Sequence, residues 1–217
     1  MSIIRLTPEH KYILKVSNAA SADDAAFLLL RLEYCCDRIY NQDVMILRIL
    51  GIDPGLATVG FSIVDSDKNK LKLVTCGVIS TCAHTSLSSR LDRIFCDMNE
   101  LISTFSPDVM SIEELFFNTN VTTGIAVAHA RGVILLAAYR AGVGVFEYTP
   151  LQVKQAVVGY GRAEKNQVID MVRRILSLPA APKPDDAADA VALAICHARS
   201  STSLLSQKGD NEVCSTI

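Results

Sequence analysis

The chain has 217 residues, half of them hydrophobic, and a formal net charge of −2. This length and hydrophobic content suffice for one folded domain with tails. The longest apolar run, Gly132 to Ala138, is about a third of the length that crosses a bilayer, so we expect no membrane span. Asp23 and Asp24 interrupt the approach to a short apolar run near the N-terminus, which argues against a secretory signal. We therefore expect a cytoplasmic protein.

The seven cysteines include no Cys-x-x-Cys pair. An odd number without close pairs favours neither a disulfide framework nor a zinc ribbon. We expect reduced thiols that serve mostly as small core residues.

The N-terminal residues 1–44 contain one helical pattern, Asp23 to Tyr40, but no motif that carries chemistry. Met45 then resembles a natural protein start that leads into a buried strand. We predict an N-terminal extension over residues 1–44, which is either a mis-assigned start or a disordered or lineage-specific arm. The folded domain is predicted over residues 45–200, and the Ser/Thr-rich residues 201–217 are predicted to be a disordered tail.

The hydrophobic pattern predicts three strands, a helix and a fourth strand in the first half of the domain. The three strands are separated by short polar turns, which favours an antiparallel meander. The helix is amphipathic and stops before Pro107. In chain order these elements are Ile46 to Ile52, Val59 to Asp65, Leu71 to Ser80, the helix Leu87 to Phe105, and the strand Val109 to Glu113.

In the second half of the domain, the sequence pattern predicts a long apolar helix, a short strand and three further helices. The glycines at 142 and 159 mark helix ends, and Pro150 suits a first helical turn. The predicted elements are the helix Thr123 to Ala141, the strand Gly144 to Tyr148, and helices from Thr149-Pro150 to Val158, Ala163 to Leu176 and Asp185 to Arg199. Together they indicate an α/β fold with a mixed sheet of about five strands flanked by helices.

Acidic residues stand at the ends of two predicted buried strands and at the start of the last helix. Asp53 ends the first strand, and Glu113 and Glu114 end the fourth, where only one of two adjacent side chains can face a shared site. Asp186 and Asp189 are three apart and share one helix face. A turn-forming role for Asp53 and helix-dipole stabilisation by the helical acids are the alternatives for each residue alone. As a set, the carboxylates suit two magnesium ions and phosphodiester hydrolysis.

Residues 151–175 carry an excess of basic residues over acidic ones. A basic surface there would bind phosphates, whereas a solvated helix face is the alternative. The basic residues are Lys154, Arg162, Lys165, Arg173 and Arg174, against Glu164 and Asp170.

Five strings in this order resemble the successive motifs of the RuvC family of Holliday-junction resolvases, which are crossover junction endodeoxyribonucleases. They span about 150 residues, from 46 to 198. The strings are Leu50-Gly51-Ile52-Asp53-Pro54-Gly55, Ile112-Glu113-Glu114-Leu115-Phe116-Phe117-Asn118, Ala130-Arg131-Gly132, Val153-Lys154-Gln155-Ala156-Val157-Val158-Gly159 and Asp186-Ala187-Ala188-Asp189-Ala190.

The resemblance implies a homodimer with a ribonuclease-H-like fold that resolves four-way DNA junctions by paired symmetric nicks during recombination and repair. It implies catalytic and metal-binding roles for Asp53, Glu113, Asp186 and Asp189. The cofactor is then Mg²⁺, two ions per subunit, with Mn²⁺ as a substitute, and RuvA and RuvB are the expected partner motor. Phe116 resembles the aromatic residue that stacks on a junction base, and Lys154 and Lys165 match phosphate-facing lysines, to which we add Arg162 from the basic segment.

The chain departs from the family pattern at two positions. Thr119 stands where a lysine commonly precedes Asn120, which removes a possible phosphate contact, and His129 stands where glutamine often precedes Ala-Arg-Gly. Neither position touches the carboxylates. We assign no chemical role to His84, His129 or His197, because each lacks a spaced partner.

Three other functions compete with the resolvase interpretation. An actin-like ATPase or sugar kinase needs a second strand-Asp-x-Gly hairpin and a phosphate-binding glycine loop, and the sequence has neither. A nuclease for ribosomal RNA precursors is disfavoured by the complete Asp-x-x-Asp helix together with the Lys154 segment. A catalytically inert junction-binding protein is disfavoured by the intact set of acids.

Overall fold

The computed structural model describes residues 46–68, 70–115 and 121–211, with only the backbone described for residues 121–123 and 202–211. The predicted N-terminal extension, residues 1–44, lies outside the described residues. The first described strand begins at Ile46, next to the predicted domain start at Met45.

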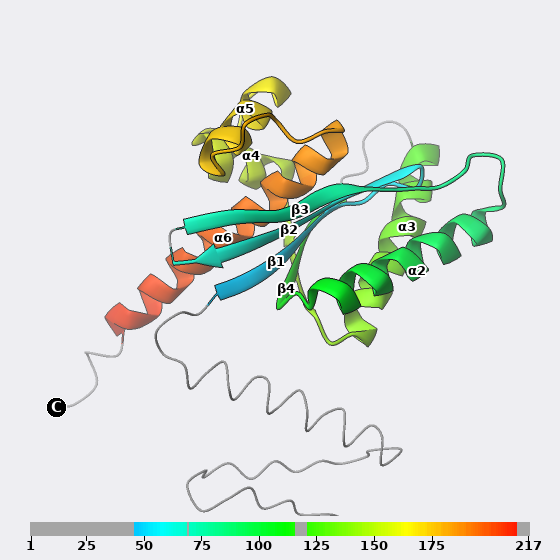
Figure 1. The fold of residues 1–217 in the computed structure, drawn as a ribbon, viewed down its shortest axis with the longest axis horizontal. Coiled ribbons are helices and arrows are strands. Elements are labelled where there is room, and N and C mark those ends of the chain that lie inside the picture. The colour runs from blue at the N-terminus through cyan, green and yellow to red at the C-terminus, as the bar shows by residue number, and fades with distance from the viewer. Residues whose placement is uncertain (1–45, 69, 116–120, 212–217) are drawn as a thin grey trace, which may run out of the picture. The chain divides into compact units, whose positions relative to one another are not determined.

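The centre of the domain is a five-stranded mixed sheet in the order β3-β2-β1-β4-β5 (Figure 1). Its first three strands form an antiparallel meander, and β4 and β5 continue the sheet parallel to β1. The predicted mixed sheet and its meander are therefore confirmed. The strands are β1 (Ile46–Asp53), β2 (Thr58–Asp67), β3 (Lys70–Ser80), β4 (Val109–Glu113) and β5 (Gly144–Tyr148).

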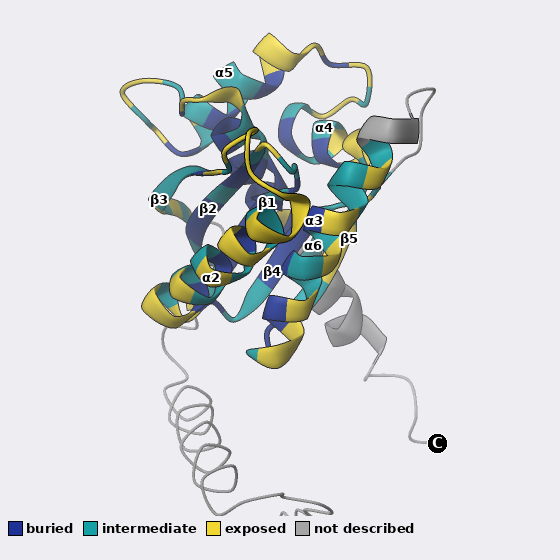
Figure 2. Ribbon diagram, turned by 90° about the vertical axis from the view of Figure 1, so that its right-hand side faces the viewer, coloured by how far each residue is buried: buried dark blue, intermediate teal, exposed yellow. Residues whose placement is uncertain are grey.

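Helices cover both faces of this sheet (Figures 1 and 2). One face packs against α2 and α3, and the other against α4, α5 and α6. Their bounds are α2 (Leu87–Phe105), α3 (Val121–Arg140), α4 (Pro150–Val158), α5 (Lys165–Ile175) and α6 (Asp185–Asn211).

Local capping explains why most predicted helix bounds agree with the structure. Helix α4 begins after Thr149, whose hydroxyl accepts from the amide of Gln152 while the Gln152 side chain accepts from the amide of Thr149. It ends at Gly159, whose φ of 97° is a left-handed conformation that glycine adopts at little cost. Helix α5 starts at Lys165, two residues later than predicted, because Glu164 occupies the cap position.

The last helix is longer than predicted. It continues to Asn211, whereas the sequence pattern placed its end at Arg199. The tail predicted to be disordered from residue 201 is therefore helical through residue 211, and residues 212–217 lie outside the described residues. A polar Ser-rich composition indicated a tail but did not exclude continuation of an existing helix.

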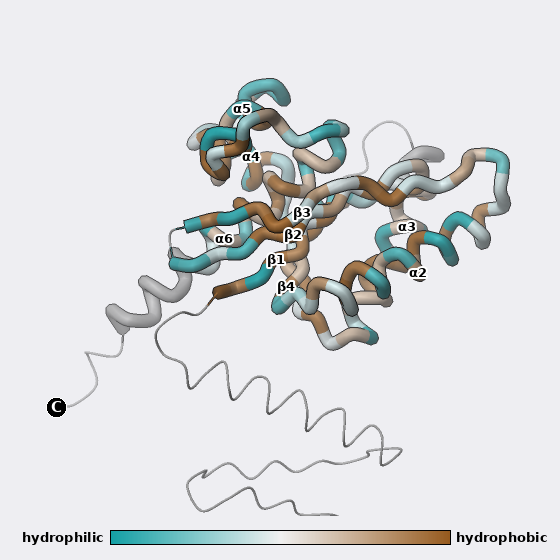
Figure 3. The backbone as a smooth tube through the Cα atoms, viewed as in Figure 1, coloured by the Kyte–Doolittle hydropathy of each residue, from teal (hydrophilic) through white to brown (hydrophobic). Residues whose placement is uncertain are grey.

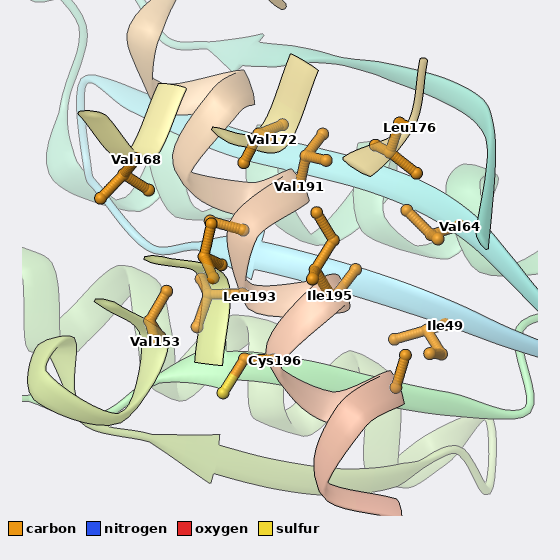
Figure 4. Packing of buried hydrophobic residues seen from close by; sticks show 14 of the residues in the cluster. Ile49, Val64, Val153, Val168, Val172, Leu176, Val191, Leu193, Ile195 and Cys196 are labelled. Atoms are coloured by element: carbon orange, nitrogen blue, oxygen red, sulfur yellow. The ribbon is translucent and has the colours of Figure 1, made fainter. Parts of the chain in front are cut away.

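Successive side chains of β1 point to opposite faces of the sheet, so the hydrophobic core forms two clusters, one on each face. Ile49 packs with the α4, α5 and α6 side, shown in Figure 4, whereas its neighbour Leu50 packs with α2 and α3. The backbone tube of the central strands is accordingly coloured largely as hydrophobic (Figure 3), and the two clusters lie on opposite faces of the sheet. Within the described part of the chain, the helices are too short or too polar to traverse a bilayer.

Candidate active site

Three predicted carboxylates meet where β1 ends beside the start of α6. Asp53, Asp186 and Asp189 each offer an oxygen, and these oxygens lie within 4.8 Å of one another. Ile52 faces the α2 and α3 cluster, so the next side chain, Asp53, faces α6. The three acids therefore form one compact set of oxygen donors, and hard cations such as Mg²⁺ prefer oxygen donors.

Glu113 is the last residue of β4, the strand beside β1. The parallel register pairs Ile52 with Ile112, which places Asp53 and Glu113 at the same level of adjacent strands. Their side chains are close enough for a hydrogen bond between the two carboxyls. Glu114, the residue after the strand, is exposed, whereas Glu113 is partly buried.

Small residues in the sheet let α6 approach closely enough to deliver its acids. A Cβ on Gly51 would lie 2.1 Å from the carbonyl oxygen of Ala190, and a Cβ on Gly60 would lie 2.0 Å from that of Asp186. The buried hydroxyl of Ser62 donates to the Ala190 carbonyl at 2.9 Å. These contacts fix the distance between the helix backbone and the strands.

A second buried serine, Ser111 on β4, donates to the carbonyl of Leu193 at 2.8 Å. Sequence reasoning missed this seating of α6 on the sheet. The available signal was that a small residue stands two positions before Asp53 and before Glu113, on the same strand face. The small helix residues Ala187, Ala188 and Ala190 are buried.

The converging carboxylates repel one another in a partly buried site. Burial, followed by the charges of Glu113, Asp189 and Asp186, raises the pKa of Asp53 to about 7. Burial and then the charge of Asp189 raise the pKa of Glu113. A divalent cation bound among these oxygens would offset the repulsion, so the donor set fits a metal.

The predicted lysines lie at this site. Lys165 Nζ lies 3.0 Å from Asp189 Oδ2 and 3.4 Å from Asp185 Oδ2. Burial acts to lower the pKa of Lys165, but hydrogen bonding to Asp189 and the nearby acidic charges outweigh it and raise that pKa. Lys154 and Lys165 both line a cavity of about 240 Å³ that Glu113 and Asp189 also line. Two of the acids and two basic residues therefore line the same cavity.

Other predicted residues stand apart from this cluster or outside the described chain. Arg162 is exposed and does not line the cavity, and Phe116 lies outside the described residues. His84 and His129 are exposed. His197 is buried and shares a hydrogen bond of 2.8 Å between its Nδ1 and the Tyr148 hydroxyl, which is a packing role.

The chain matches known proteins over the region that contains the site. A family model described as "Crossover junction endodeoxyribonuclease RuvC" matches residues 49–197. A protein of that name from Rubrobacter xylanophilus is 59% identical over 150 residues, which cover 69% of this chain and 84% of the relative. One from Heliobacterium modesticaldum is 58% identical over 154 residues, covering 71% of this chain and 95% of the relative.

A solved structure is similar over the same region. The structure described as "T. thermophilus RuvC in complex with Holliday junction substrate" has a TM-score of 0.69 and 37% sequence identity, with coverage of 72% of this chain and 96% of the other. The match of the family model to more than half of the chain and the high identity to these relatives agree with the site geometry. The chain belongs to the RuvC family of crossover junction endodeoxyribonucleases.

Proposed function

We propose that this chain resolves four-way DNA junctions by paired symmetric nicks, using two metal ions in each subunit. The observation that carries the proposal is the convergence of Asp53, Asp186 and Asp189 oxygens within 4.8 Å, beside Glu113. The family membership of the chain and the junction bound by its Thermus thermophilus relative support DNA as the substrate.

In this proposal the four carboxylates hold Mg²⁺, for which Mn²⁺ substitutes. Such ions, when bound, neutralise charge that develops on a phosphate during hydrolysis. The chain contributes the positions of the ligands: two come from the ends of adjacent strands, and two come from a helix seated on the sheet by buried serines. A ligand set on rigid elements keeps its geometry during the reaction.

The cations beside the acids are proposed to bind the DNA backbone. Lys154 and Lys165 line the cavity next to Glu113 and Asp189, so each can bind a phosphate whose neighbour lies at the metals. We assign Arg162 to more distant phosphates because it is exposed beyond the cavity. Phe116 remains our candidate for stacking on a junction base, from its place in the motif alone.

We propose that a second copy of the chain covers the exposed face of α3. Ile125, Leu136 and Tyr139 lie along one stripe of this helix, and Tyr139 is 82% exposed. A Cβ on Gly132, in the same stripe, would meet no atom within 4 Å. An isologous pairing would give two active sites, one for each of the strands to be nicked. We further propose cytoplasmic action with a RuvA and RuvB motor as partner.

A gel assay tests the function. Purified protein is incubated with a labelled four-way junction and with the matched linear duplex, with Mg²⁺ or with chelator, beside Asp53→Asn. The proposal requires paired nicks confined to the junction that depend on both Mg²⁺ and Asp53. Binding without cutting would identify an inert junction binder, and cleavage of RNA in preference to the junction would identify a ribonuclease.

A further inference from the structure

Arg131, in the Ala-Arg-Gly motif on α3, reaches the end of the strand that carries Glu113. Its Nε donates a hydrogen bond to the Glu113 carbonyl oxygen at 3.3 Å. Its Nη2 forms an ion pair with the Glu147 carboxylate on β5. The Arg131 side chain is only 13% exposed, whereas that of Glu147 is 46% exposed. The guanidinium therefore bridges the ends of two adjacent strands from the helix layer.

These contacts act on the backbone of Glu113 and leave its carboxylate free for the site. Ile112 points into the α2 and α3 cluster, so the Glu113 side chain points to the opposite face of the sheet, toward α6. Arg131 approaches from the α3 side and holds the carbonyl. The amide of Glu114, which belongs to the same peptide unit, donates to the Tyr148 carbonyl at 2.9 Å. Both ends of that peptide unit are thus held.

The register of the sheet makes this peptide unit important for ligand geometry. Glu113 is the final residue of β4, and the described β1–β4 pairing ends one residue earlier, at Ile52 and Ile112. Contacts from α3 and β5 therefore fix the peptide that follows Glu113, where pairing to β1 has ended. A partly desolvated guanidinium is costly unless hydrogen bonds and an ion pair compensate it.

We propose that Arg131 is a positioning residue, which sets the backbone of Glu113 so that its carboxylate joins Asp53 and the α6 acids in metal binding. The inference rests on the proposed role of Glu113 as a ligand. Groups that orient metal ligands typically change metal affinity by about 10- to 100-fold when they are mutated. The cation also clamps β5, because Glu147 pairs with it from the neighbouring strand.

Calorimetric titration of the full-length protein with Mn²⁺, without DNA, tests the inference independently of cleavage. We expect Arg131→Ala to raise the dissociation constant for Mn²⁺ about 10-fold. The dissociation constant of Arg131→Lys should lie between those of the wild type and Arg131→Ala. A lysine ammonium lacks the planar fork with which arginine contacts both the Glu113 carbonyl and the Glu147 carboxylate. Glu147→Gln should cause a smaller increase in the same direction, because it weakens only one arm of the clamp.

Two further variants make the outcomes decisive. Arg93→Ala removes an exposed ion pair with Asp97 on α2 and should leave Mn²⁺ binding unchanged. Glu113→Gln should weaken binding, and normal binding by this variant would overturn both the ligand assignment and the inference. If Glu113→Gln weakens binding but Arg131→Ala only lowers the melting temperature, the positioning role alone is wrong. If Arg131→Ala does not fold, unchanged Mn²⁺ binding by Glu147→Gln would overturn the role.

Discussion

Lys165 Nζ lies 3.0 Å from Asp189 Oδ2, so a cation at the first position of α5 is paired with an acid of the candidate metal site. The lysine is half exposed and lines the same cavity as Glu113 and Asp189. A metal bound at Asp189 would satisfy that carboxylate and leave the ammonium available to a phosphate. The pair thus connects metal binding with DNA binding.

Replacing this lysine should reduce the electrostatic part of junction binding. We expect Lys165→Ala to weaken junction affinity and to reduce the slope of log affinity against log salt by about one, the change for one lost phosphate contact. Fluorescence anisotropy in chelator at several salt concentrations measures both quantities. Lys72→Ala, an exposed lysine on β3, is the matched control. Equal slopes for wild type and Lys165→Ala would show that Lys165 does not contact phosphate.

The clustered carboxylates should make the metal-free protein lose stability as pH rises. The Asp53 pKa is about 7 in the folded chain against an ordinary value of 3.8, so the folded state holds this proton more tightly. Below about pH 4 the group is protonated in both states and has no effect. Between about pH 4 and 7 the free energy of unfolding falls, by an amount on the order of 4 kcal/mol for a shift of this size, and the loss is complete above pH 7.

Urea unfolding in chelator at pH 4, 5.5 and 8 checks this sign. Asp53→Asn lacks the titrating group, so it should be more stable than wild type at pH 8 and similar near pH 4. Added Mg²⁺ should then stabilise the wild type more than the variant, because ligands that bind the folded state raise its stability. Identical pH profiles for the two proteins would contradict the electrostatic account of the site.

Close packing of α6 on β2 should be intolerant of a single methyl group. In Gly60→Ala the new Cβ would lie 2.0 Å from the Asp186 carbonyl oxygen, which is backbone and cannot move independently of the helix. We expect loss of cleavage and a lower melting temperature. Gly144→Ala is the control, because a Cβ there would meet only the Phe146 ring edge at 3.8 Å. A fully active Gly60→Ala protein would contradict the described seating of α6.

The exposed stripe of α3 should determine the oligomeric state. Leu136→Asp places a charge in the proposed interface without disturbing the buried face of the helix, where Ile134 and Ala137 pack. We expect the variant to be monomeric by analytical ultracentrifugation and to lose paired nicking. Val74→Asp, at another exposed apolar residue, should leave the wild-type state unchanged. A dimer that survives Leu136→Asp would place the interface elsewhere.

Residues 1–44 are predicted to be dispensable. A chain that starts at Met45 should fold and cleave a four-way junction at a rate close to that of the full chain, because β1 and every proposed ligand follow that residue. Thermal melts and the gel assay compare the two proteins. A truncated chain that does not fold would show that the extension contributes to the folded domain.

The sequence by itself determined the strands and helices, because period-2 and period-3.6 patterns, capping residues and turn residues act locally. The predicted bounds of α2 and β4 agree with the structure, whereas α6 continues beyond its predicted end. The ordered motifs also indicated the four acids by residue number. Local patterns alone could not establish how close those acids lie, since that distance depends on packing between distant segments.

Tertiary structure decided that distance and the partners of the acids. Ser62 and Ala190 are 128 positions apart, yet their hydrogen bond seats α6 against the sheet. Likewise, the approach of Arg131 to the Glu113 carbonyl depends on the placement of α3 over the end of β4. Close approach of backbones depends on small residues in two elements at once, and such a match becomes visible only when both elements are placed in space.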